Sequence, residues 1–324
     1  MDSKIFKSVY INDVFSLVGP LEKCSKLKKF DMAIDDYYFK EKTFEQAEIK
    51  MQSTALKNVL VKNKLAENDL DFIIGGDLLN QISVTSYNVE HFDIPYLGVY
   101  SACATFIESL IIGATFLESQ LANKVIAITS SHNLTSERQF RYPVEYGSLR
   151  PKCSTFTTTG AVSTLLSSKR GKWKITSATI GRVINMGIKD ANNMGAVMAP
   201  AAADTLVRHL KNKDENINDY DLILTGDLGC TGATILKQYL KKTEGINLKK
   251  HMDAGCEIYV DSDITHSGGS GPVCLPLVLF NKVLTSNKYK KILVIGTGSL
   301  HSPVLLNQHK SIPAIAHAVS LEVI

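Results

Sequence analysis

The chain has 324 residues, of which 44% are hydrophobic and 21% charged, and its formal net charge is +4 at pH 7. These values are ordinary for a globular protein that buries a substantial core in one large or two medium-sized domains. Lys and Arg are scattered and only mildly in excess, which argues against the strongly basic patch of a nucleic-acid-binding protein. We therefore expect no nucleic-acid partner.

Membrane and redox signals are both weak. No apolar run reaches the roughly 18 residues that a transmembrane helix needs, and the segment MDSKIFKSVY lacks the apolar core of a signal peptide. We therefore expect a protein that is at most peripheral to a membrane.

The cysteines lie far apart without a C-x-x-C pair, which indicates reduced thiols and neither a disulfide framework nor a zinc site. They are Cys24, Cys103, Cys153, Cys230, Cys256 and Cys274.

Taken in chain order, the pattern of apolar residues predicts strands alternating with helices. In the first half, strands are predicted within residues 8–18, 71–76, 94–100, 124–129 and 156–166. Residues 45–65 are expected to form an amphipathic helix, whose apolar face carries Ala47, Met51, Ala55 and Val59. A second helix is expected after the strand at 94–100, and residues 134–155 read as a long polar loop.

The second half follows the same plan. Strands are predicted within residues 172–180, 219–228, 257–260, 291–295 and 315–324. The Ala-rich stretch 194–210 is expected to be helical after Pro200, because proline is tolerated best in the first turn of a helix. A Gly-rich turn at 267–271 is expected to lead into an apolar helix that reaches Leu284.

Two stretches of the first half recur in the second half in the same order. The sequence DYDLILTGDL at 219–228 matches DLDFIIGGDL at 69–78 in six of ten positions, at an offset of 150 residues. Likewise, KILVI at 291–295 resembles KVIAI at 124–128. We infer an internal duplication into an N-terminal half, residues 1–170, and a C-terminal half, residues 171–324.

The turn Ser101-Ala102-Cys103 joins a predicted strand to a predicted helix and places Cys103 at the helix N-terminus. Unpaired backbone N–H groups and the helix dipole favour negative charge there. Cys103 is therefore expected either to have a lowered pKa and act as a nucleophile, or to mark a place where N–H groups hold a carboxylate. The structural alternative is a small buried cysteine without a function.

Strands alternating with helices predict an α/β protein with mixed sheets, and the duplicated pattern with a cysteine at a buried helix resembles the thiolase fold. That resemblance implies two βαβαβ halves stacked as a five-layered αβαβα sandwich around central helices at 103–120 and 271–284. Several motifs resemble the stage V sporulation protein AD family over essentially the whole chain. They are GDLLNQ at 76–81, SAC at 101–103, TSSHN at 129–133, ERQFRYPVEYG at 137–147, MAPAAADT at 198–205, DYDLILTGDLG at 219–229, SGGSG at 267–271 and IPAIAHAV at 312–319.

The resemblance also bears on catalysis. Condensing enzymes of the thiolase fold pair their cysteine with His–His or His–Asn, whose nitrogen donors stabilise developing negative charge. At the matching positions this sequence has Asp227, and Gly268, Gly269 and Ser270. A carboxylate would oppose the developing charge, so the sequence argues against Claisen chemistry. His132 and His266 could in principle serve as bases, and the alternative is that both are ordinary loop histidines.

The resemblance implies that the protein belongs to an operon that moves dipicolinic acid. The expected ligand is therefore dipicolinate, with or without calcium. Its two carboxylates suit a helix N-terminus and arginine donors, while Tyr142 and Tyr146 could stack on its ring. Arg138 and Arg141 could instead pin their loop to the scaffold. Asp77 and Asp227 could reach calcium or cap the following turns. The expected ligand-binding residues are Asp77, Cys103, Ala104, Thr105, His132, Arg138, Arg141, Asp227, Gly268 and Gly269.

Two functions remain open. The first is a non-catalytic dipicolinate-binding protein that acts in dipicolinate uptake into the developing spore, peripheral to the spore or forespore inner membrane, with membrane proteins of the same operon as partners. The second is a cysteine-dependent acyltransferase or ketoacyl synthase-like enzyme that uses Cys103. We also expect a homodimer, because an uncovered edge strand near the cysteine would be an aggregation liability.

Overall fold

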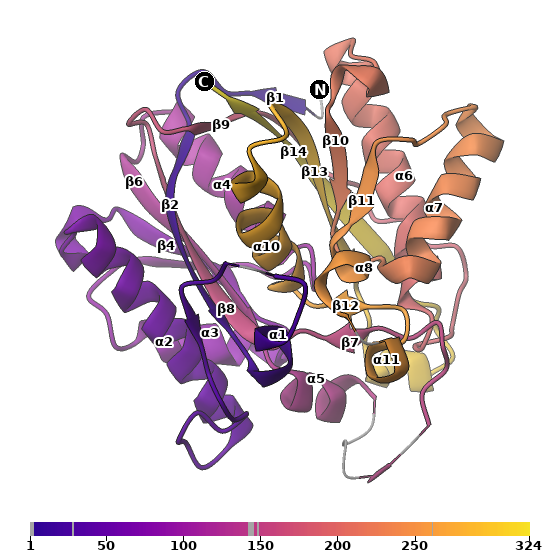
Figure 1. Ribbon diagram of the computed structural model, residues 1–324, viewed down its shortest axis with the longest axis horizontal. Coiled ribbons are helices and arrows are strands. Elements are labelled where there is room, and N and C mark those ends of the chain that lie inside the picture. The colour runs from indigo at the N-terminus through magenta and orange to yellow at the C-terminus, as the bar shows by residue number, and fades with distance from the viewer. Residues whose placement is uncertain (1–2, 28, 142–145, 148, 261) are drawn as a thin grey trace.

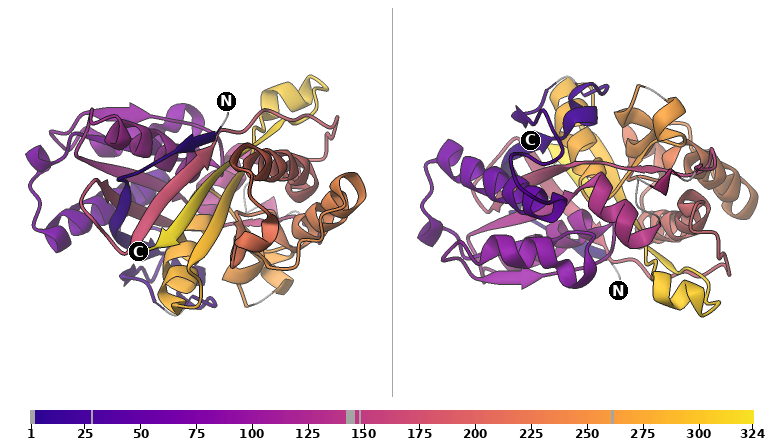
Figure 2. Two further views of the ribbon diagram at one scale, coloured as in Figure 1. Left: turned by 90° about the horizontal axis from the view of Figure 1, so that it is seen from above. Right: turned by 90° about the horizontal axis from the view of Figure 1, so that it is seen from below.

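The computed structural model describes residues 3–27, 29–141, 146–147, 149–260 and 262–324. Figure 1 shows strands running through the middle of the molecule, with helices between them and on both outer sides. The views from above and below in Figure 2 show the same layering.

The first half supplies the outer helices of one side and one central helix. Its strands are β1 (Ser3–Ile5), β2 (Tyr10–Val18), β3 (Met32–Ala33), β4 (Phe72–Gly76), β5 (Tyr96–Gly98), β6 (Lys124–Ser131), β7 (Phe156–Thr157) and β8 (Gly160–Ser167). Its helices are α1 (Pro20–Lys23), α2 (Phe44–Asn63), α3 (Ser83–Val89), α4 (Thr105–Glu118) and α5 (Asn133–Phe140).

The second half repeats this arrangement. Its strands are β9 (Trp173–Thr179), β10 (Leu222–Thr225), β11 (His251–Asp253), β12 (Gly269–Ser270), β13 (Lys291–Ser299) and β14 (Ala314–Val323). Its helices are α6 (Met194–Lys213), α7 (Gly229–Glu244), α8 (Ala254–Ile258), α9 (Ser262–Thr265), α10 (Cys274–Val278) and α11 (Pro303–Asn307).

The two halves have the same strand order. It is β5-β4-β6-β8-β2 in the first half and β11-β10-β13-β14-β9 in the second, so corresponding strands occupy corresponding places. In each half the first three strands in this order are parallel and the next two are antiparallel to their neighbours. The halves join where Tyr10 and Ile11 of β2 pair with Lys174 and Trp173 of β9. The predicted α/β fold with duplicated halves is confirmed.

The layers follow from which faces are apolar. Helix α2 covers the outer face of the first half and buries Ala47, Met51, Ala55 and Val59, as predicted. Helices α6 and α7 cover the outer face of the second half (Figure 1). Helix α4 packs against strands of both halves and its Phe106 meets Phe280, just after α10, edge to face at 5.9 Å. These contacts give the five layers αβαβα.

Three predictions for the first half need correction. The strand expected to be buried at 94–100 is β5, a short edge strand whose Leu97 remains 41% exposed, because nothing described covers its outer side. The polar stretch 134–155 begins with helix α5, which starts because the His132 side chain accepts a hydrogen bond from the Leu134 N–H. The single strand at 156–166 is two strands, β7 and β8.

Three predictions for the second half need correction. Helix α6 begins at Met194, six residues before Pro200, because the Asn193 side chain caps it by accepting from the Ala196 N–H. Residues 257–260 do not form a strand, since the Asp253 side chain caps helix α8 there. The second central helix starts at residue 274 rather than 271 and continues through a π-helical segment at 279–283.

The cysteine prediction also needs correction. Cys230 at the start of α7 and Cys256 of α8 form a disulfide, with their Cα atoms 5.0 Å apart. The spacing of 26 residues gave no sign of this pair, because the approach of α7 to α8 is a tertiary contact. Four cysteines are free, namely Cys24, Cys103, Cys153 and Cys274.

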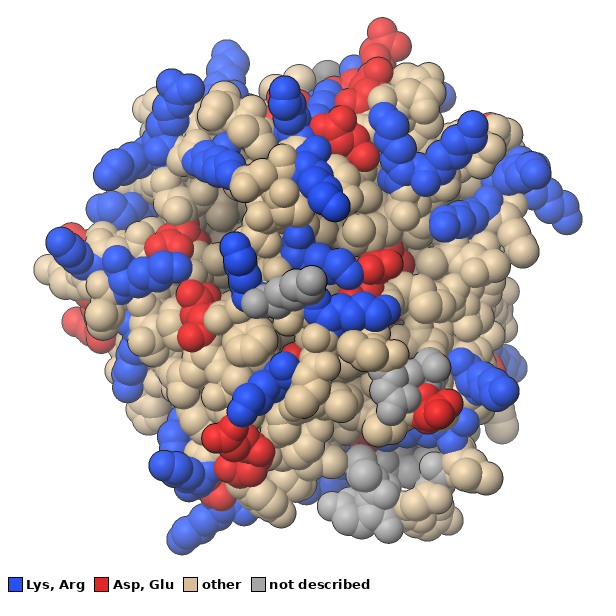
Figure 3. Space-filling model, viewed as in Figure 1, with Lys and Arg blue, Asp and Glu red and all other residues tan. Residues whose placement is uncertain are grey.

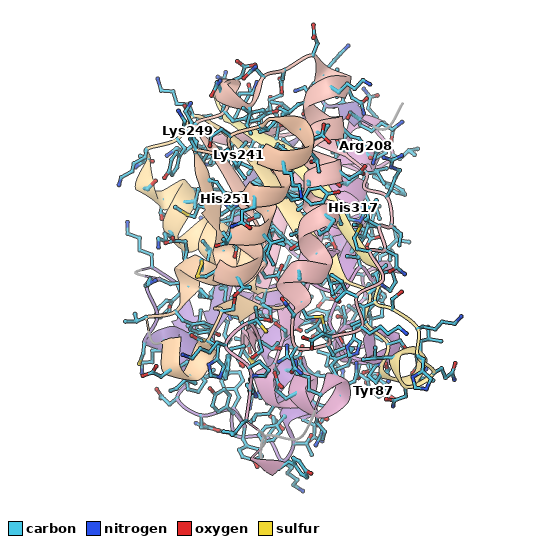
Figure 4. All side chains as sticks on the ribbon, turned by 90° about the vertical axis from the view of Figure 1, so that its right-hand side faces the viewer. Tyr87, Arg208, Lys241, Lys249, His251 and His317 are labelled. Atoms are coloured by element: carbon cyan, nitrogen blue, oxygen red, sulfur yellow. A yellow bond between two sulfur atoms is a disulfide. The ribbon has the colours of Figure 1, made fainter. Side chains whose placement is uncertain are left out.

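The surface agrees with the mild charge. On the face shown in Figure 3, basic residues are spread widely and outnumber acidic ones, without a single concentrated patch. Lys241 and Lys249 lie at one end of the molecule and Tyr87 of α3 near the other (Figure 4). Within the described residues, no helix combines the length and apolar character needed to cross a membrane.

Candidate functional site

A pocket opens beside Cys103, at the end of the molecule where α5, β7, β12 and α11 gather (Figure 1). Its walls come from both halves. They include Tyr100, Cys103, Phe140, Arg141, Ser270 and His301. The pocket measures about 530 Å³ when its open mouth is included, but only about 60 Å³ can hold the centres of water-sized molecules. This is room for a few waters or a small flat ligand.

The turn before α4 sets the position of Cys103. Ala102 has φ 51°, a left-handed conformation that reverses the chain. The Thr105 hydroxyl donates to the Ala102 carbonyl at 2.6 Å and accepts from the Ser101 N–H at 3.1 Å. Strand β13 passes so close that a Cβ on Gly298 would lie 2.1 Å from the Ser101 carbonyl oxygen. The second half therefore holds this turn in place.

The same contacts change the expected role of the helix N-terminus. The Ala104 N–H donates to the Ser101 carbonyl at 3.0 Å and the Thr105 N–H to the Ala102 carbonyl at 3.3 Å. Both residues are completely buried and neither lines the pocket. These two donors are engaged within the turn, so neither is available to an anion in the pocket.

Asp227 lies directly behind Cys103. Its carboxylate accepts hydrogen bonds from the Gly271 N–H at 3.0 Å, from the Thr297 hydroxyl at 3.1 Å and from the Cys103 thiol. Burial raises the pKa of Asp227 to about 7, and the hydrogen bonds oppose this rise. The side chain beside the cysteine is thus a carboxylate and not a nitrogen donor.

The expectation of a lowered pKa at Cys103 is wrong. Burial, followed by the negative charge of Asp227 and the hydrogen bond to it, raises the pKa of Cys103 well above its ordinary value. The hydrogen bond from the Gly271 N–H opposes this change but is smaller. At neutral pH the side chain is therefore a thiol, which is a poor nucleophile.

Arg141 belongs to a buried charge cluster at the pocket wall. Its guanidinium donates to the Glu137 carboxylate at 2.7 Å and to the Thr155 carbonyl at 3.1 Å. Arg150 contacts the other oxygen of the same carboxylate at 3.3 Å and lies over the Phe156 ring. Two arginines share one carboxylate, so the cluster keeps one net positive charge beside the pocket.

His301 was not predicted from the sequence. It follows β13, lines the pocket and is only 7% exposed. Its ring packs against Phe140 with the centroids 5.8 Å apart. Tyr100, Phe140 and His301 also line an outer hollow bounded by α11, so they form the neck between the two spaces.

Several predicted site residues lie outside the pocket wall. The Nε2–H of His132 donates to the Tyr37 carbonyl at 2.8 Å, and the ring stacks on Phe44. Arg138 forms an ion pair with Glu45 of α2, which pins α5 to the scaffold. His266, the other candidate base, is not part of the pocket wall.

The remaining predicted residues have structural contacts. Asp77 accepts from the Leu79 N–H and from the Thr85 N–H and hydroxyl, all at 2.8 Å, and so caps the following turn. Gly268 and Gly269 carry the chain into β12 behind the pocket, and the wall residue there is Ser270.

Two further predictions concern tyrosines and metals. Tyr142 lies outside the described residues, and the Tyr146 side chain is 73% exposed and does not line the pocket. Within the described part of the chain, no group of three or more His, Cys, Asp or Glu is arranged to hold a metal ion.

Solved structures with the same fold include condensing enzymes. OleA of Xanthomonas campestris with bound lauric acid and lauroyl-CoA aligns with a TM-score of 0.65 at 13% identity, covering 98% of this chain and 100% of that one. The 3-oxoacyl-[acyl-carrier-protein] synthase III of Aquifex aeolicus VF5 aligns with a TM-score of 0.53 at 16% identity, covering 99% of both chains. These alignments establish the thiolase-like fold.

The sequence comparisons are more specific. The family model for stage V sporulation protein AD matches residues 2–322. Stage V sporulation protein AD of Bacillus subtilis (strain 168) is 40% identical over 318 residues, covering 97% of this chain and 94% of that protein. The chain therefore belongs to the stage V sporulation protein AD family.

Proposed function

We propose that this protein binds dipicolinate in the pocket beside Cys103, without chemical conversion, and serves its uptake into the developing spore. The observation that carries the proposal is the position of Cys103 at the wall of a small pocket, with the buried Asp227 carboxylate beside it. Burial and this carboxylate both raise the pKa of the thiol, which opposes its use as a nucleophile, while Arg141 supplies a positive charge at the pocket wall.

The arrangement opposes acyl transfer for two reasons. Each missing oxyanion donor costs roughly 2.7–4 kcal/mol of transition-state stabilisation, and neither Asp227 nor the glycines at 268–269 supply a side-chain nitrogen. In addition, the raised pKa of Cys103 keeps the thiolate scarce. The protein thus keeps a cysteine at the pocket wall but lacks the neighbouring groups that acyl transfer would need.

The pocket suits a flat dicarboxylate. Its narrow interior excludes bulky ligands, and Phe140 and Tyr100 offer apolar ring surfaces. Arg141 and Arg150 together exceed the charge of Glu137 by one, which favours an anion. Arginine is also the side chain best shaped to pair with a planar carboxylate.

Further parts of this proposal concern the setting. The protein binds dipicolinate alone or as its calcium chelate. Its partners are membrane proteins of the same operon, and it acts at the inner membrane of the spore. A homodimer through the exposed edge of β5 is included, because an open edge strand otherwise invites non-specific pairing.

Calorimetric titration of dipicolinate into the purified protein tests the ligand. We expect saturable binding that weakens about tenfold or more in Arg141→Ala, because a charge-assisted hydrogen bond contributes roughly 1.5–3 kcal/mol. Arg170→Ala is the matched control, since Arg170 is exposed and far from the pocket lining. Absence of binding to the folded wild-type protein would contradict the proposal.

Location and catalysis need separate tests. In Cys103→Phe the larger ring fills the pocket, so a variant that keeps its melting temperature is expected to lose dipicolinate binding. Incubation with short-chain acyl-CoA should leave the intact mass unchanged. An acyl adduct on the wild-type protein that is missing from Cys103→Ser would instead establish an enzyme.

A further inference from the structure

His301 has an unusual environment for a buried histidine. Neither ring nitrogen has a hydrogen-bond partner among the described residues, although the side chain is more than nine-tenths buried. Burying a polar group without a partner destabilises a fold. A sequence that keeps such a group at a pocket wall therefore points to a partner that arrives with a ligand.

Other buried or partly buried histidines of the protein show the contrast. His209 contacts the Thr179 hydroxyl at 2.7 Å through Nδ1 and the Tyr220 hydroxyl at 3.0 Å through Nε2. His251 contacts the Thr225 hydroxyl at 2.8 Å. His317 has one paired nitrogen, which accepts from the Gly181 N–H at 3.1 Å. None of these histidines lines the pocket.

The position of His301 relative to Arg141 indicates which chemical groups a ligand of this pocket would need. Both side chains line the same pocket, and the charge of Arg141 is close enough to lower the pKa of His301 further after burial has done so, to about 4. His301 is thus neutral near pH 7, with one N–H donor and one bare nitrogen. Arg141 supplies charged donors, whereas His301 supplies a neutral donor at the neck.

We propose that His301 is a specificity-determining residue, which donates a hydrogen bond to the second carboxylate of a small aromatic dicarboxylate whose first carboxylate pairs with Arg141. This inference rests on the proposed function and assigns the part of the site that separates dicarboxylates from monocarboxylates. The bare nitrogen of the ring remains available to a water at the neck.

Titration of two ligands into matched variants tests the assignment. Dipicolinate and picolinate, which lacks one carboxylate, are titrated by calorimetry into the wild-type protein, His301→Phe and His301→Gln. We expect His301→Phe to weaken dipicolinate binding about tenfold and to leave picolinate binding unchanged. His301→Gln keeps a donor and should retain most of the preference for dipicolinate. His91→Phe is the control, because His91 is exposed and outside this pocket.

Stability supplies a second readout. Because His301→Phe removes unpaired polar atoms and keeps a ring against Phe140, the free variant should melt at the same temperature as the wild type or higher. If the variant does not fold, imidazole nitrogen resonances of the wild-type protein decide the matter. Those of His301 should shift when dipicolinate is added and change much less with picolinate.

The outcomes separate the two proposals. Wild-type protein that binds no dipicolinate overturns the proposed function, and the role of His301 with it. Wild-type protein that binds dipicolinate, together with a folded His301→Phe that binds it equally well or loses both ligands by the same factor, overturns the role of His301 alone. Unshifted His301 resonances on dipicolinate binding also overturn it.

Discussion

Replacing Asp227 with asparagine should activate Cys103. Asp227 has φ 46°, and asparagine tolerates this left-handed conformation better than most residues. The two donors contact different oxygens of Asp227, so asparagine keeps one oxygen to accept from the Gly271 N–H and places its amide nitrogen where the other oxygen meets the Thr297 hydroxyl. The substitution therefore removes a negative charge near the sulfur and replaces one carboxylate oxygen with an amide donor.

The size of the effect follows from Coulomb's law. Two charges about 4 Å apart at an effective dielectric constant of about 20 interact by about 4 kcal/mol, which is an upper figure for the destabilisation of the thiolate. Even a third of this raises the thiolate fraction about tenfold. A thiolate of lower pKa is also less nucleophilic, so the net gain in alkylation rate is about threefold or more.

The assay is the rate of alkylation by iodoacetamide near pH 8, read for each cysteine by peptide mass mapping. Cys153 is partly exposed, does not contact Asp227 and serves as the internal control. We expect the rate of Cys103 relative to Cys153 to rise in Asp227→Asn. A folded variant in which this ratio is unchanged or lower would refute the argument that Asp227 suppresses the thiolate.

Other predictions concern stability and assembly. Burial raises the pKa of Glu48 to about 8. The protonated carboxyl of Glu48 therefore contributes its full stabilisation below the ordinary pKa of 4.5, and this stabilisation is lost as pH rises through about 8. Melting temperatures across this range should fall less in Glu48→Gln than in the wild type. A Cβ on Gly75 would lie 1.8 Å from the Ile128 carbonyl oxygen. Gly75→Ala should therefore lower the free energy of unfolding by about 3 kcal/mol or more in urea titrations. In Gly187→Ala the new Cβ meets no atom, and only the left-handed backbone conformation should lower the free energy of unfolding, by about 1–2 kcal/mol. Sedimentation at tens of micromolar should give a dimer, and a single species of 35.6 kDa would argue against pairing through β5.

Local patterns predicted much of the fold. The apolar face of α2 and the strands β4 and β6 were found because their periodicity depends only on neighbouring residues. Several of the failures share one cause, which is a side chain that caps a helix where the local pattern predicts a strand, a loop or a later start. Asn193 does so for α6 and Asp253 for α8.

The site shows the same limit more sharply. The sequence placed Cys103 correctly before a buried helix, but the direction of its pKa shift depends on tertiary burial and then on Asp227, which is 124 residues away in the chain. His301 carried a usable signal, because it follows the end of a strand as His132 does. Which of these histidines faces the pocket is decided by the docking of α5 and α11, a tertiary feature that the sequence pattern does not contain.

A crystal structure of the protein grown with dipicolinate would show directly whether the ligand binds beside Cys103. We expect density for the ligand between Cys103 and the neck, with one carboxylate within hydrogen-bond distance of Arg141 and the thiol of Cys103 unmodified. A saturated complex with the ligand elsewhere on the molecule, and the pocket beside Cys103 filled only by water, would contradict it.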